Sequence, residues 1–164
     1  MTEQKQAGEA RSPRDRLALR LIAFGARFQR PVTLGVRGLV LDDQNRVLLV
    51  RHTYVSGFYL PGGGVESGET LMDALERELH EEANVLLDEP PELFGLYFNR
   101  RFSARDHVAL YLVRSFRLTQ PHAPDREIAE AGFFALDALP DDTTPATRAR
   151  LSEALEKAPI SPYW

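Results

Sequence analysis

The chain has 164 residues and a net charge of −4, with 43% hydrophobic and 27% charged residues. These values fit one globular domain and exclude disordered and fibrous classes. The sequence shows no run of about eighteen apolar residues and no signal-peptide pattern at its start, so a soluble, cytoplasmic protein without membrane contact is expected. The absence of cysteine excludes disulfides, thiolate nucleophiles and zinc–thiolate sites.

The N-terminal part is predicted to be an extension of a single domain. Residues 1–12 are polar and are expected to form a flexible tail, and residues 13–164 are assigned to one domain. Ser12 and Pro13 supply an N-cap and a first-turn proline, which predict a helix over residues 13–29. Its apolar stripe consists of Leu17, Leu21, Phe24 and Phe28. That stripe could lie on the domain, on a second subunit of a homodimer or on a membrane surface.

The rest of the chain predicts strands and helices without regular alternation. Apolar residues alternate over residues 32–43 and recur over 46–52, with a DDQN turn between them, which predicts a hairpin. Thr70 as N-cap and Asp73 at the capping-box position predict a helix over residues 70–83. Further elements are expected as strands at 92–100 and 107–117, a short apolar piece at 132–136 and a final helix at 144–157. This mixture favours an α+β fold with a mixed sheet.

Three glutamates gather on one face of the predicted helix 70–83. Glu78, Glu81 and Glu82 fall within about a third of its circumference, beside an apolar stripe that is expected to be buried. Like charges at this spacing repel, and partial burial raises their pKa values unless a cation lies close. Mg²⁺ and Mn²⁺ prefer such oxygen ligands. The alternative is a solvated helix face with salt bridges.

A glycine-rich stretch, GGGVESGET, precedes this helix and allows its backbone to pass close to a metal or a phosphate. Together the two segments have the spacing G-x5-E-x7-R-E-U-x-E-E-x-x-U, where U is a bulky aliphatic residue. The matching positions are Gly63, Glu69, Arg77, Glu78, Leu79, Glu81, Glu82 and Val85. With these residues the sequence resembles the Nudix hydrolases. One position departs from the family pattern, because Asn84 stands where the family has glycine. Asparagine also adopts the left-handed conformation of a helix C-cap, so the turn is expected to survive.

The resemblance implies a Nudix fold, which is an α/β/α sandwich with a mixed sheet between helices. It also implies that residues 63–85 form a loop–helix–loop that holds a divalent metal against a pyrophosphate. By position, Glu78 and Glu82 match the principal metal ligands, and Glu81 matches an additional ligand or the residue that activates water. Gly62 matches the family residue whose carbonyl commonly coordinates the metal. Three further positions, Arg77, Glu69 and Gly63, match the residues that support the ligand helix.

Several residues outside the motif are candidates for the same site. Glu127 and Glu130 could provide another ligand or the general base, since several family members place a catalytic carboxylate in a downstream loop, or they could be ordinary surface residues. Arg51 could contact phosphate or form a structural ion pair. His52 is expected to pack or to form a hydrogen bond.

Substrate binding is also assigned to Arg37, Arg100, Arg101 and Tyr54. The segment NRRFSARDH, residues 99–107, could bind the terminal phosphate or sugar, or it could be a solvated turn. Tyr54 could stack on a base or belong to the core.

The expected activity is a Mg²⁺-dependent hydrolysis of a pyrophosphate bond, with Mn²⁺ as a substitute. The favoured substrate is a nucleoside diphosphate sugar or an ADP-ribose-like compound, and a (d)NTP pyrophosphohydrolase is the alternative. Two further hypotheses are a non-catalytic nucleotide-sensing module and action on RNA ends. Action on RNA ends is suggested by the arginine-rich segment 11–30. That segment has no interleaved stacking residues beyond Phe24 and Phe28, so nucleic-acid binding is not favoured.

Overall fold

A computed structural model describes residues 32–164, so the predicted tail and the helix at 13–29 lie outside the described residues. Thr33–Trp164 group as one folded unit. Within the described part of the chain, no helix is long and apolar enough to cross a membrane.

The central sheet has the strand order β1-β5-β4. Its strands are β1 (Thr33–Val40), β5 (Asp106–Val113) and β4 (Glu92–Phe98), with β1 parallel and β4 antiparallel to β5. The glycine-rich segment 60–65 runs along the other edge of β1. There the N–H of Val36 donates to the carbonyl of Gly63, and the N–H of Gly38 donates to the carbonyl of Pro61. Both edges of β1 are therefore hydrogen-bonded.

The remaining strands form two smaller pairs. β2 (Val47–His52) is antiparallel to β7 (Ile128–Phe134), and β3 (Val85–Leu87) is antiparallel to β6 (Phe116–Leu118). The predicted hairpin between residues 32–43 and 46–52 was therefore largely wrong. Its turn exists, but β1 and β2 meet only at a Leu41–Val47 bridge because each strand has its ladder with a partner far along the chain.

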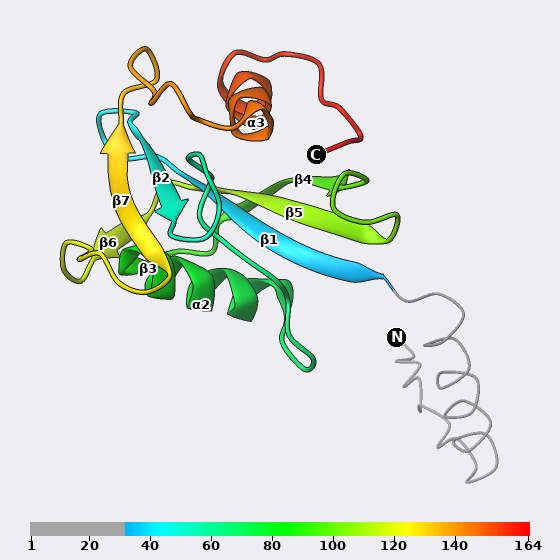
Figure 1. The fold of residues 1–164 in the computed structure, drawn as a ribbon, viewed down its shortest axis with the longest axis horizontal. Helices are drawn as coiled ribbons and strands as arrows, with labels where there is room; N and C mark the ends of the chain where they lie inside the picture. The colour runs from blue at the N-terminus through cyan, green and yellow to red at the C-terminus, as the bar shows by residue number, and fades with distance from the viewer. Residues whose placement is uncertain (1–31) are drawn as a thin grey trace, which may run out of the picture. The chain divides into compact units, whose positions relative to one another are not determined.

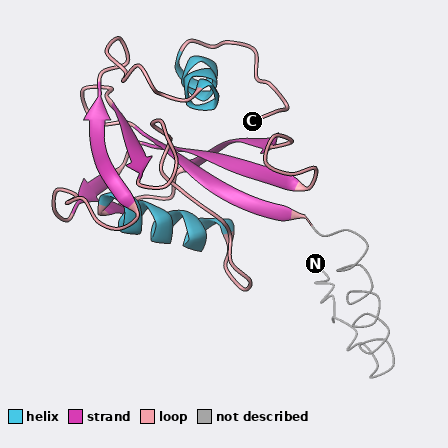
Figure 2. Ribbon diagram, in the orientation of Figure 1, coloured by secondary structure: helices cyan, strands magenta, loops and turns pink. Residues whose placement is uncertain are grey.

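Two helices cover opposite faces of the central sheet (Figures 1 and 2). On one face, α2 (Leu71–Ala83) shares a buried cluster with the side chains of β1 that include Val36 and Val40. On the other face, α3 (Pro145–Leu155) contributes Leu151 to a second cluster that contains Leu39 of β1. Successive side chains of β1 point to opposite faces of the sheet, so this strand contributes residues to both clusters. The predicted α+β fold with a mixed sheet between helices is confirmed.

Helix α2 begins and ends with the predicted caps. The hydroxyl of Thr70 accepts from the N–H of Asp73, and the carboxylate of Asp73 accepts from the N–H of Thr70, so the capping box is complete. Asn84 ends the helix with φ 56° and ψ 29°, in the left-handed region, and its N–H donates to the carbonyl of His80. This turn leads directly into β3.

The left-handed conformation of Asn84 gives a test of the cap. Asn84→Ala is expected to lower the free energy of unfolding by about 1 kcal/mol, because a Cβ without a local polar group disfavours this conformation. Asn84→Gly is expected to be neutral or slightly stabilising. Urea unfolding monitored by circular dichroism measures both, and an alanine variant as stable as the glycine variant would contradict the assignment of the cap.

Candidate active site

Glycines in the segment 60–65 allow two carboxylates of α2 to reach its backbone. Gly62 has φ +135°, and a Cβ there would overlap the carbonyl oxygen of Val36 on β1. Its N–H donates to Oε2 of Glu82 at 2.7 Å. A Cβ at Gly63 would overlap the carboxylate of Glu78. Glycine is therefore required at position 62, whereas a side chain at position 63 would displace the carboxylate of Glu78. The two carboxylates converge on one short stretch of main chain.

Burial makes these two carboxylates electrostatically unfavourable. Glu82 is only 4% exposed, and burial raises its pKa to about 7, even though the charge of Arg37 and the hydrogen bond from Gly62 both lower it. Burial also raises the pKa of Glu78, against the opposing effects of Arg77 and Arg37. Arginine neighbours therefore offset the loss of hydration only in part.

Arg77 forms hydrogen bonds with the glycine-rich loop and with the glutamates of α2. Its Nε donates to Oε1 of Glu69 at 2.8 Å, and its Nη2 donates to the carbonyl of Gly64 at 3.0 Å. Its Nη1 donates to Glu78 at 2.8 Å and to Glu81 at 3.2 Å. The guanidinium thus links the loop to two helix carboxylates, and its bonds to Glu69 and then Glu78 raise its pKa. Glu81 is the outermost of the three glutamates, with a side chain that is 59% exposed.

His52 lies against Glu82, which the sequence did not indicate. Its Nε2 is 3.5 Å from Oε1 of Glu82, and its ring packs between Tyr54 and Tyr59 at centroid distances of 5.2 and 5.8 Å. Burial and then the charge of Arg37 lower its pKa, so the imidazole is neutral near pH 7. The β-bulge at Arg51 and His52 sets this position at the end of β2. His52 was expected to pack or to form a hydrogen bond, and it is buried, but nothing in the sequence indicates its partner.

Arg37, Tyr54 and Glu127 lie near enough to Glu82 to interact with it electrostatically. Arg37 donates through Nη1 to the carbonyl of Leu60 at 3.0 Å, and its charge acts on Glu78, Glu82 and His52. The pKa of the Tyr54 hydroxyl is raised, first by its desolvation and then by the charges of Glu127 and Glu82, although the residue is 71% exposed. A pocket of about 370 Å³ lies over the segment 51–57, with His52 and Tyr54 in its lining, but none of the three glutamates lines it.

Arg51 forms an ion pair with Glu130. The two residues face each other across β2 and β7, and Nη2 of Arg51 is 2.8 Å from Oε2 of Glu130. Each side chain therefore already has a partner, and both of the roles suggested by the sequence, phosphate contact for Arg51 and a ligand or base for Glu130, stay predictions.

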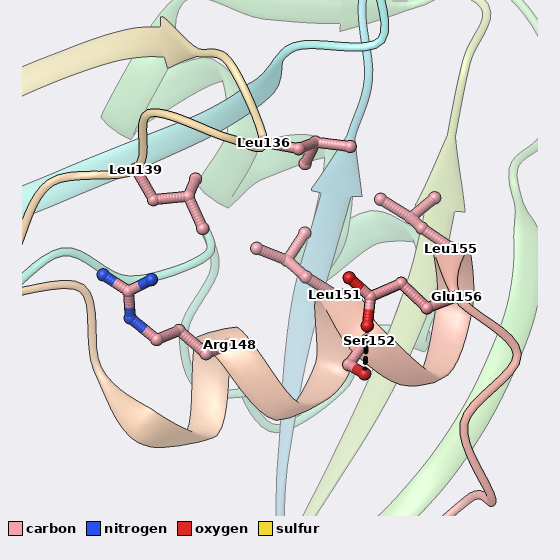
Figure 3. A pocket seen from close by; sticks show the side chains of 7 residues that line it. All are labelled: Leu136, Leu139, Arg148, Leu151, Ser152, Leu155 and Glu156. Atoms are coloured by element: carbon pink, nitrogen blue, oxygen red, sulfur yellow. Dashed lines mark hydrogen bonds between the residues drawn. The ribbon is translucent and has the colours of Figure 1, made fainter.

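Arg100 and Arg101 lie apart from the residues above. They belong to the turn between β4 and β5 and line a different pocket, together with residues of α3 and the C-terminal segment. A further pocket of about 260 Å³ lies on α3. Figure 3 shows four leucines around it and a hydrogen bond from Ser152 to Glu156. Besides the leucines it is lined by Arg148, Ser152 and Glu156, and it includes none of the motif residues, so it is not the candidate catalytic site.

The oxygen donors near the glycine segment fit a hard divalent cation. Within residues 32–164, no three His, Asp or Glu side chains form a ready-made metal site, and both Glu78 and Glu81 accept hydrogen bonds from Arg77. However, Glu78 and Glu82 are incompletely neutralised, and the carbonyl of Gly62 accepts no hydrogen bond from any described residue. Carboxylate and carbonyl oxygens of this kind suit Mg²⁺ or Mn²⁺.

Comparison with curated proteins gives relatives with several activities. The chain is 32% identical over 105 residues to an ADP-ribose pyrophosphatase of Methanocaldococcus jannaschii, covering 62% of this chain and 61% of that protein. It is 32% identical over 120 residues to an 8-oxo-dGDP phosphatase of Mus musculus, covering 71% of this chain and 36% of that protein. The chain thus spans less than two thirds of the length of either relative.

Solved structures share the fold. A MutT NUDIX hydrolase from Burkholderia pseudomallei superposes with a TM-score of 0.64 at 27% identity, covering 75% of this chain and 98% of that one. An ADP-ribose pyrophosphatase from Streptococcus suis gives a TM-score of 0.60 at 24% identity, covering 78% and 94%. The family model described as NUDIX domain matches residues 31–155, which include the glycine segment and all three glutamates. The chain therefore belongs to the Nudix family.

Proposed function

We propose that this chain is a Mg²⁺-dependent hydrolase of the pyrophosphate bond in a nucleoside diphosphate linked to another group. The observation that carries the proposal is the convergence of Glu78 and Glu82 on the Gly62–Gly63 backbone, where burial raises the pKa values of both carboxylates. Similarity to an ADP-ribose pyrophosphatase favours an ADP-ribose-like substrate, and a nucleoside diphosphate sugar has the same diphosphate linkage.

Glu78, Glu82, Glu81 and the carbonyl of Gly62 would hold the metal. A divalent cation bound there would neutralise the diphosphate and increase the acidity of a coordinated water. Arg77 and Glu69 fix the loop to the helix, and Arg77 also holds Glu78 and Glu81 in place. Arg37 supplies a fixed positive charge beside these carboxylates, suited to a substrate phosphate.

Hydrolysis needs a group that accepts a proton from water as the oxygen–phosphorus bond forms and the bridging oxygen leaves. Glu127 and Glu81 are both exposed carboxylates near Glu82, and either fits this role. Tyr54 presents an open ring beside His52, where it can stack on the base of the substrate.

Removing one proposed ligand tests the metal role. Glu82→Gln is expected to lower kcat/KM about a thousandfold, equal to about 4 kcal/mol of transition-state stabilisation, with the fold retained. Glu76→Gln, on an exposed position of the same helix, is the matched control and should keep full activity. Wild-type activity is expected to vanish in EDTA and to return with Mg²⁺ or Mn²⁺. Unchanged turnover in Glu82→Gln would refute the ligand role.

The raised pKa of Glu82 predicts a pH dependence of stability without metal. Its carboxyl has a pKa of about 7 in the folded protein and the model value of 4.5 when unfolded. Because the unfolded chain releases this proton first, the folded state loses stability as the pH rises from about 4.5 to about 7. In EDTA, the stability difference between wild type and Glu82→Gln is therefore expected to shift by roughly 2 kcal/mol in favour of the variant from about pH 5 to pH 8.

Thermal or urea unfolding of both proteins across this pH range measures the difference. The comparison cancels the titration of the other groups, which the two proteins share. A difference that stays constant with pH would show that Glu82 is not desolvated as described.

A substrate panel separates the favoured activity from a (d)NTP pyrophosphohydrolase. With Mg²⁺, we expect ADP-ribose or a nucleoside diphosphate sugar to be cleaved to a nucleoside monophosphate and a sugar phosphate with a higher kcat/KM than any nucleoside triphosphate. Product analysis by ion-exchange chromatography measures this. Preference for a triphosphate would reverse the order, and no turnover of any compound by metal-loaded protein would support a nucleotide-sensing module.

A further inference from the structure

A pocket of about 420 Å³ lies between the β4–β5 turn, α3 and the C-terminal segment. Figure 1 shows the C-terminal segment running from α3 back to the β4–β5 hairpin. The pocket is lined by Arg100 and Arg101 of the turn, by Arg150 of α3 and by Tyr163 and Trp164. Its volume falls in the ordinary range for small-molecule sites.

Buried polar contacts hold the back wall of this pocket rigid. Arg150 is 2% exposed and donates to Oε1 of Glu153 at 2.6 Å and to the carbonyl of Tyr163 at 2.7 Å. Its guanidinium also lies over the rings of Tyr97 and Trp164, at 4.1 and 5.5 Å from their centroids. A buried ion pair with this many partners has little freedom, so the wall is formed before any ligand binds.

Main-chain hydrogen bonds fix the C-terminal segment to β4. The N–H of Phe98 donates to the carbonyl of Pro162 at 2.9 Å, and the N–H of Trp164 donates to the carbonyl of Phe98 at 3.1 Å. The N–H of Ser161 donates to Glu153 at 3.0 Å. Tyr163 and Trp164 are thereby held at the pocket as two aromatic surfaces.

The mouth of the pocket carries two exposed arginines, Arg100 and Arg101, that pair with no acidic side chain among the described residues. Arg100 lies over the ring of Tyr163, 4.4 Å from its centroid. Neither Arg100 nor Arg101 forms an ion pair or a side-chain hydrogen bond with any residue that the structure describes, whereas the charge of Arg150 is matched by Glu153. Two guanidinium groups are therefore available to an anion, and arginine suits phosphate in particular because it can donate two parallel hydrogen bonds.

We propose that this pocket binds a small phosphate monoester with a flat ring, such as a nucleoside monophosphate, as a second site outside the hydrolytic centre. The phosphate pairs with Arg100 and Arg101, and the ring lies against the aromatic side chains at 163 and 164, since stacking of this kind accepts any base. Its lining includes neither the glycine segment nor any residue of α2, so binding here requires no divalent metal.

The single tryptophan of the chain, Trp164, reports on this pocket directly. AMP is titrated into Glu82→Gln protein in EDTA while tryptophan fluorescence and heat are recorded. A saturable decrease in fluorescence is expected, with the same Kd from calorimetry. Arg100→Ala/Arg101→Ala in the same background is expected to raise that Kd at least about tenfold, by loss of two charge-assisted contacts. The control Arg105→Ala/Arg114→Ala removes two exposed charges outside this pocket and should leave the Kd for AMP unchanged.

Adenosine and inorganic phosphate distinguish the two parts of the ligand. Both are expected to bind more weakly than AMP, and only adenosine should change the fluorescence. Equal Kd values for adenosine and AMP would overturn the proposal. A Kd for AMP that is the same with and without Arg100 and Arg101 would overturn it too. AMP binding that appears only in wild-type protein with Mg²⁺ would also overturn it, because it would place the ligand at the hydrolytic centre. Loss of turnover in Glu82→Gln bears on that centre alone, so the two proposals fail separately.

Discussion

The site depends on the pairing of the glycine segment 60–65 with the free edge of β1. Two hydrogen bonds to β1 fix the carbonyls of Pro61 and Gly63, and this leaves the N–H of Gly62 directed to Glu82. The positions of the loop and of the α2 carboxylates are thereby fixed relative to one strand of the central sheet. Because β1 is also paired along its length with β5, the backbone at the site is as rigid as the sheet itself.

The cost of this arrangement is buried negative charge. The folded protein without metal holds Glu82 at a pKa of about 7, and neutral His52 lies beside it. Arg37 and Arg77 relieve the repulsion only in part. Such a site is least stable where it is fully ionised, which is also the state that binds a cation best. Under the proposed metal-binding role of Glu82, affinity for metal and stability without metal are therefore opposed at the same residue.

Local features of the fold were predictable from the sequence, and non-local ones were not. The capping box at Thr70 and the cap at Asn84 depend on residues within one turn, and both were predicted correctly. The partners of β1 and β2 were mistaken, because alternation identifies a strand without identifying its neighbour. The three-residue strands β3 and β6 carry too little periodicity to detect, and the single strand expected at 107–117 is divided between β5 and β6.

The same distinction applies to the site. The motif spacing brings Glu78, Glu82, Arg77 and the glycines together, since all lie within one loop and one helix. The contact of His52 with Glu82 and the Arg51–Glu130 pair depend on how β2 and β7 are placed, which no local pattern reveals. Arg100 and Arg101 are separated from the carboxylates because the β4–β5 turn meets α3 and the C-terminal segment, a contact between distant parts of the chain that no local pattern reveals.

The double pairing of β1 also bears on solubility. An apolar strand with an open edge is a template for intermolecular sheet formation, and half of the residues of β1 are buried. The loop that positions the carboxylates covers this edge with the backbone of residues 60–65. Substitutions of Gly62 that displace the loop would therefore expose the unpaired edge of β1, and aggregation would accompany the loss of the site.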